Sequence, residues 1–121
     1  MAFPVPEHFI VAAEEALGRT FPRALKARLA ISNGGDVATS VNDWILNPVR
    51  DASDQKRLSR SANDLVRESY AARQWPRFPS GGIAVASNGS GDLLVLLPGS
   101  DDIFHWYHES GKLSLVDVDW D

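Results

Sequence analysis

Three carboxylates alternate along the last residues of the chain, at Asp117, Asp119 and Asp121. Residues two apart on an extended strand point to the same side, so all three are expected on one face. A run of like charges most often serves as a solvated face. The alternative is an acidic rim that binds a basic partner. In that case Trp120 and Trp106 would make it a protein-binding patch, because aromatic side chains are favoured interface anchors.

Two histidines, His105 and His108, are candidates for metal ligands. Residues three apart on a strand point to opposite faces, so the two side chains are not expected to bind one ion together. The chain has no cysteine and no HExxH motif. Its C-terminal aspartates also lack the glycine and the distal glutamate of a calcium loop. The sequence therefore predicts no metal site and no cofactor.

The glycine-rich segment Gly89-Ser90-Gly91 is expected to be a turn rather than a nucleophile or a phosphate cradle. Both of those sites need a helix after the glycines, whereas the apolar run that follows indicates a strand. Asp92 comes directly after the turn, where its carboxylate can accept backbone N–H groups and hold a hairpin. No catalytic residue is predicted. An enzyme would need a pocket that joins His105 with Asp92 or with an acidic tail residue.

The composition describes one globular domain, residues 1–121, with 44% hydrophobic residues. Twelve basic against sixteen acidic residues give a net charge of −4, which argues against direct nucleic-acid binding and favours basic partners. The sequence shows no secretory signal and no run long enough to span a membrane. A cytoplasmic protein without membrane contact is therefore predicted.

The elements that must position these residues follow from the apolar pattern. Two runs, 83–87 and 93–97, flank the turn and predict a central β-hairpin. Apolar residues at helical spacing predict a first helix from Glu7 to Leu17, ended by Gly18. A second helix begins at Pro22 and ends at Asn33-Gly34-Gly35.

Further elements are predicted on both sides of the hairpin. A third helix is expected somewhere within 54–74, and a strand within 41–49, where Pro48 indicates a sheet edge. Two more strands are expected at 103–108 and 112–118. The predicted fold class is α+β, with an N-terminal helical hairpin and a third helix packed on a mainly antiparallel sheet of about four to six strands.

Two blocks carry a resemblance to a known family. The first runs from Glu15 to Pro22 (EALGRTFP) and continues with Leu25-Lys26 and Asn33-Gly34-Gly35. It resembles the opening "E-x-x-L-G-x-x-L/F-P…L/Y-K…N-G-G" of the SUKH superfamily, the Smi/Knr-like domains. The second block, from Ile83 to Asp92, is similar to that family's "I-x-I-A-x-x-G-x-G-D". The two blocks stand in the family's order.

The resemblance implies an α+β protein that binds other proteins and is not an enzyme. Bacterial members are typically immunity proteins that neutralise a cognate toxin, often a nuclease, and here the toxin is expected to have a basic surface. Fungal members regulate cell-wall synthesis through protein contacts, so the alternative is a general interaction or regulatory scaffold domain without catalytic activity. The shared residues are expected to be structural, at helix ends and in the hairpin: Gly18, Pro22, Asn33, Gly34, Gly35, Gly91 and Asp92.

Overall fold

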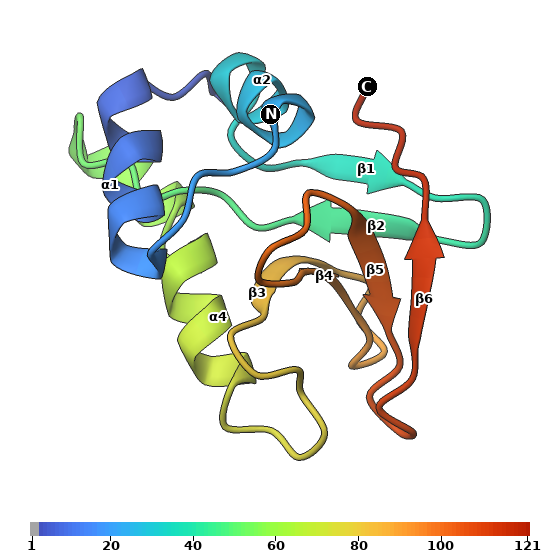
Figure 1. The fold of residues 1–121 in the computed structure, drawn as a ribbon. Coiled ribbons are helices and arrows are strands. Elements are labelled where there is room, and N and C mark those ends of the chain that lie inside the picture. Colours follow the sequence, from blue (N-terminus) through green and yellow to red (C-terminus); the bar gives the residue numbers. More distant parts are fainter. Residues whose placement is uncertain (1–2) are drawn as a thin grey trace.

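Six antiparallel strands form one sheet in chain order within residues 3–121, the part of the chain that the computed structural model describes (Figure 1). Each strand pairs with its neighbours in sequence, so the sheet is a meander. The predicted hairpin forms its centre. The strands are β1 (Asp36–Ala38), β2 (Asp43–Leu46), β3 (Ile83–Ser87), β4 (Leu93–Leu96), β5 (Ile103–Trp106) and β6 (Leu113–Val116).

The sheet curls until its two edges meet. Beyond the end of β6, Asp119 forms a bridge with Ala38 of β1, in which each backbone N–H donates to the other residue's carbonyl, at 3.1 and 2.7 Å. Figure 1 shows the red C-terminal segment passing beside β1. No other bridge between these edges is found within residues 3–121. The curl is therefore closed at one end and open along β6.

Two consecutive helices, α1 (Glu7–Leu17) and α2 (Arg23–Ile31), form the N-terminal helical pair. The predicted bounds of α1 are confirmed. Gly18 ends it with a left-handed φ of 77°, and its N–H donates to the carbonyl of Glu14 at 2.8 Å. Pro22 directly precedes α2 and accepts a hydrogen bond from the N–H of Lys26.

The prediction of a helix within 54–74 is confirmed, but the structure has two short helices there instead of one. These are α3 (Gln55–Arg60) and α4 (Leu65–Ala72). Each begins at its own aspartate cap: Asp54 accepts the N–H of Arg57 at 2.8 Å, and Asp64 accepts the N–H of Arg67 at 2.9 Å. The second cap starts a new helix where the apolar pattern alone indicated a continuous one.

The strand predicted within 41–49 is confirmed as β2, but β1, a three-residue strand, was not predicted. Because β1 lies outside β2, Pro48 does not mark the edge of the sheet. It follows the last residue of β2, and its carbonyl accepts the N–H of Leu65 at 2.7 Å.

The main core lies on the inner face of the curled sheet, under α1 and α2. It contains buried side chains from every layer, among them Leu25, Leu29, Trp44, Leu46, Leu94 and Leu96. A smaller cluster on the outer face contains Val95 and Trp106 and is covered by Phe78 from the segment after α4. These two layers confirm the predicted α+β fold class. None of the helices within residues 3–121 has the length and hydrophobicity needed to cross a bilayer.

Candidate functional site

The C-terminal aspartates lie on the outer face of the curled sheet. Asp117, Asp119 and Asp121 are exposed, whereas the residues between them, Val118 and Trp120, pack against the main core. Strand geometry explains the alternation, because successive side chains point to opposite faces.

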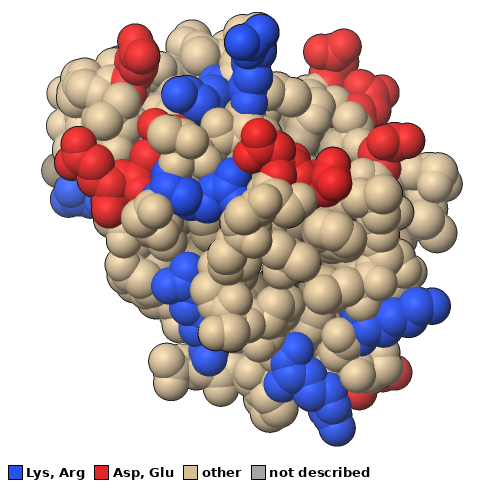
Figure 2. All heavy atoms as spheres, in the orientation of Figure 1, with Lys and Arg blue, Asp and Glu red and all other residues tan. Residues whose placement is uncertain are grey.

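Two further carboxylates, Asp36 and Asp43, share this face. Ala38 is paired with both Asp43 and Asp119, and residues directly opposite each other point to the same side. Asp36 lies two residues before Ala38 and is also exposed. Figure 2 shows acidic side chains gathered at this corner of the molecule. We call the group the acidic seam: Asp36, Asp43, Asp117, Asp119 and Asp121.

No member of the acidic seam forms an ion pair within residues 3–121. The carboxylates of the seam therefore carry negative charge into solvent without an ion-pair partner, although the Arg28 guanidinium donates to the backbone carbonyl of Asp36 at 3.3 Å. Such a surface attracts positively charged molecules over about 8–10 Å at physiological ionic strength.

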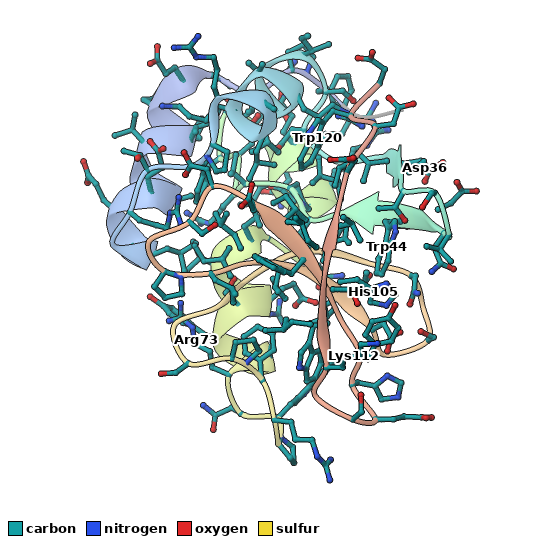
Figure 3. All side chains as sticks on the ribbon, turned by 45° about the vertical axis from the view of Figure 1, so that its right-hand side comes forward. Asp36, Trp44, Arg73, His105, Lys112 and Trp120 are labelled. Atoms are coloured by element: carbon teal, nitrogen blue, oxygen red, sulfur yellow. The ribbon has the colours of Figure 1, made fainter. Side chains whose placement is uncertain are left out.

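The two tryptophans expected beside the acidic rim do not provide exposed anchors. Trp106 is 1% exposed; its indole N–H donates to the carbonyl of Arg77 at 3.0 Å, and its ring contacts Phe78. It is therefore not part of a binding surface. Trp120 is half-buried because it occupies an inward position of the alternating C-terminal segment. Figure 3 shows Trp120 at the same end of the molecule as Asp36.

Apolar residues that sequence reasoning missed are exposed on the outer face instead. Leu115 is 64% exposed, Leu113 is 36% exposed, and Ile45 is 59% exposed. The two leucines stand at the same alternate positions as the C-terminal aspartates. Extending that alternation back through β6 could have identified them. The candidate binding surface is thus an acidic seam beside exposed leucine and isoleucine side chains.

A second group of polar residues converges on Asp92, directly after the β3–β4 turn. One carboxylate oxygen lies 2.8 Å from Nε2 of His105, and the other lies 2.6 Å from Nδ1 of His108 and accepts the His108 backbone N–H at 3.0 Å. The expectation that the histidines point apart is wrong. Because β5 ends at Trp106, the chain turns before His108 and brings its ring back to Asp92.

The surroundings fix this cluster. His105 is 3% exposed, stacks on Tyr107 with ring centres 3.8 Å apart, and meets the edge of Trp44 at 4.9 Å (Figure 3). Partial burial raises the pKa of the Asp92 carboxyl, but hydrogen bonds from the side chains of His105 and His108 outweigh it and lower that pKa below its ordinary value of 3.8. Asp92 is therefore held as a carboxylate that joins two turns.

The structure brings His105 and Asp92 into contact. Both oxygens of Asp92 are taken up by histidine contacts, which is the geometry of a structural clasp between the β3–β4 turn and the end of β5. No group of three or more His, Asp or Glu side chains within residues 3–121 is arranged to hold a metal ion.

Gly91 allows His108 to approach the turn. Its φ is +105°, and a Cβ atom there would stand 3.0 Å from the His108 ring. Gly91→Ala is expected to lower the free energy of unfolding by about 2 kcal/mol, against about 1 kcal/mol for Gly89→Ala. Gly89 is the matched control because its φ is also positive, at +83°, but a Cβ there meets nothing within 4 Å. Denaturant unfolding measures both, and equal losses would contradict the close contact with His108.

The segment Asn33-Gly34-Gly35 links α2 to β1. The glycine cap expected from this segment is not formed, because α2 ends at Ile31 and its C-cap is Ser32 in an extended conformation. The Asn33 side chain instead pairs with the backbone of Val49: its amide N–H donates to the carbonyl and its oxygen accepts the N–H, both at 2.8 Å. Gly34 and Gly35 then turn the chain with φ of +121° and +81°. This clasp ties the start of the sheet to the segment after β2.

Comparison with protein families matches residues 4–121 to the SMI1 / KNR4 family (SUKH-1). No curated protein and no solved structure matches the chain significantly. The matched range includes both clasps and the acidic seam.

Proposed function

The chain belongs to the SMI1/KNR4 family (SUKH-1), and from this we propose that it is an immunity protein that neutralises a cognate toxin by binding to it. The family includes immunity proteins of polymorphic toxin systems. The observation that carries the proposal for this chain is the acidic seam, which is exposed and has no ion-pair partner within residues 3–121.

A nuclease toxin fits this surface best. Proteins that act on nucleic acid present Lys and Arg to the phosphates, so their active sites are basic. The seam would offer such a site carboxylates in place of phosphates. Covering the active site of the toxin needs a standard interface of about 800 Å² on each partner. The mechanism is occlusion, which requires affinity and a fast encounter rather than chemistry on the immunity protein.

The partner can be identified by affinity capture. The tagged full chain is incubated with lysate of its source and washed at low and at high salt, and the retained proteins are identified by mass spectrometry. One stoichiometric basic protein is expected, and coexpression with this chain should relieve its toxicity. A spread of weakly held proteins, with no protection on coexpression, would favour a general scaffold domain instead.

Charge reversal tests the role of the seam. Asp117→Lys combined with Asp119→Lys should slow association with the captured toxin about tenfold at low salt, because opposite charges steer the encounter. The difference should shrink at high salt, where the charges are screened. Stopped-flow or surface-based kinetics at two salt concentrations measures the association rate constants.

Glu15→Lys combined with Glu109→Lys is the matched control. Both pairs replace two exposed acids with lysines and move the formal net charge from −4 to 0. The control should associate nearly as fast as the wild type. Equal rates for the two double variants would remove the seam from the interface while leaving the immunity proposal in place.

A further inference from the structure

Strand β6 has a strand neighbour on one side only. It pairs with β5 along its whole length, and the chain beyond it meets β1 only at Asp119 within residues 3–121. In Figure 1 no element lies beside the outer edge of the β6 arrow below the β1–β2 hairpin. The edge from Leu113 to Asp117 is therefore free.

The backbone groups along this edge point outward. In an antiparallel pair, residues alternate between those bonded to the partner strand and those directed away from it. The N–H of Tyr107 donates to the carbonyl of Lys112, so the even-numbered residues Ser114 and Val116 bond to β5. The odd-numbered ones face the free edge, and Asp119, two positions further in the same series, bonds to β1.

The four side chains of β6 do not protect this edge. Natural edge strands carry charged residues (especially lysine), proline or a bulge that discourages pairing with another chain. β6 reads Leu-Ser-Leu-Val and has none of these; the charged residues, Lys112 and Asp117, stand directly before and after it. Its exposed leucines, Leu113 and Leu115, stand on the outer face in line with the aspartates of the acidic seam.

We propose that the free edge of β6 is a docking site for an extended segment of a basic protein. The segment adds a seventh strand beside Leu113–Asp117, pairs with the outward N–H and carbonyl groups, and covers Leu115 with an apolar side chain. Lysine or arginine residues on the same face of the segment, at every second position beyond that apolar residue, lie over the acidic seam. The edge itself stands on the observations above; that the basic protein is the toxin rests on the proposed function.

The negative charge of the chain favours a basic segment over a second copy of the chain at this edge. Each copy has a net charge of −4, and its seam forms no ion pair within residues 3–121. Pairing two copies along β6 would bring together two chains of the same net charge, which is unfavourable. A basic strand removes that repulsion and supplies the missing counter-charges.

Hydrogen exchange of the full chain tests the edge. In the free protein, the amides of Leu113, Leu115 and Asp117 should exchange at least about tenfold faster than those of Ser114 and Val116. A seven-residue peptide with lysine at positions 1 and 3, valine at positions 5 and 7, and threonine between them carries both residue types on one face. Added at millimolar concentration, it should slow the first set about tenfold and leave the second unchanged. The same peptide with the valine at position 5 replaced by proline keeps the charge, lacks the N–H that would pair with Leu115, and should not protect them.

Two variants give an independent readout of peptide affinity. Leu115→Pro removes an outward N–H but no bond to β5, and it should weaken peptide binding about tenfold. Leu115→Lys keeps the backbone and places a like charge against the peptide; it covers the case in which the proline variant does not fold. Equal protection by the proline-containing peptide, no protection by either peptide, or a Leu115 amide already protected in a dimer would each overturn the proposal.

The toxin assay separates this inference from the proposed function. If folded Leu115→Pro protects cells from the captured toxin as well as the wild type does, strand docking is wrong and the immunity role stands. If the peptide docks but no toxin is ever neutralised, the immunity role fails and the docking edge remains.

Discussion

Asp92→Asn is expected to lower the free energy of unfolding at pH 7 by about 3 kcal/mol, because it removes the charge from a carboxylate that accepts three hydrogen bonds. Those bonds come from the His105 ring, the His108 ring and the His108 backbone. The Asn amide would direct its N–H groups at Nε2 of His105, which would then have to give up its proton. The proton would move to Nδ1, which is buried and has no hydrogen-bond partner. Chemical denaturation measures the loss.

The pH dependence separates this loss from a general packing defect. Because the folded pKa of Asp92 lies below its ordinary value of 3.8, ionised Asp92 stabilises the fold above that pH, and this stability is lost as the pH falls through the folded pKa. The wild type and Asp92→Asn should therefore differ at pH 5–8, and the difference should narrow as the pH falls below 3.8 and through the folded pKa of Asp92. Asp102→Asn, at an exposed acid, is the control and should have little effect. A constant difference down to pH 2 would contradict the role of the Asp92 charge.

The central hairpin and α1 could be predicted because local chemistry specifies them. Turn residues between two apolar runs, and helical spacing ended by Gly18, need no distant contact to be recognised. β1 could not be predicted, since a strand of three residues has too little pattern and is defined by its partner β2. The break between α3 and α4 has a local signal as well, the capping residues 61–64, but the apolar spacing across 54–74 fits a single longer helix equally well.

The candidate site was predictable only in part. Alternation places Asp117 and Asp119 on one face, yet nothing in the sequence tells that Asp43 shares it, because the curl of the sheet brings β1 and the C-terminal segment together. The burial of Trp106 could not be predicted from the sequence either. Its burial depends on Phe78, which returns over the outer face from a separate segment.

The family motif residues act in this chain as clasps between distant segments. Asn33 joins the end of α2 to the segment after β2, and Asp92 joins the β3–β4 turn to the end of β5. Residues that hold the scaffold in this way leave the outer face free to vary. Exposed positions such as Leu115 and Asp117 can then be substituted without loss of the fold.

Asn33→Ala is expected to lower the free energy of unfolding by about 3 kcal/mol, since it leaves both backbone groups of Val49 without partners. Val49 is fully buried, so water cannot replace the lost bonds without opening the segment. The Val49 amide should exchange faster in the variant even where the global stability is matched by a lower denaturant concentration. Asn33→Asp keeps the acceptor for the Val49 N–H but loses the donor to the carbonyl.

Because Asn33→Ala loses both hydrogen bonds and Asn33→Asp loses only one, the two variants together test each bond separately. Asn33→Asp should retain slow exchange of the Val49 amide and still be destabilised, because the aspartate oxygens face the Val49 carbonyl instead of donating to it. Asn63→Ala, at an exposed asparagine, is the matched control and should change stability by less than about 0.5 kcal/mol. If Asn33→Ala costs no more than this control, the pairing with Val49 does not stabilise the fold. The asparagine of the motif would then have to act through its backbone alone, by the N–H that it donates to Phe3 at 2.7 Å.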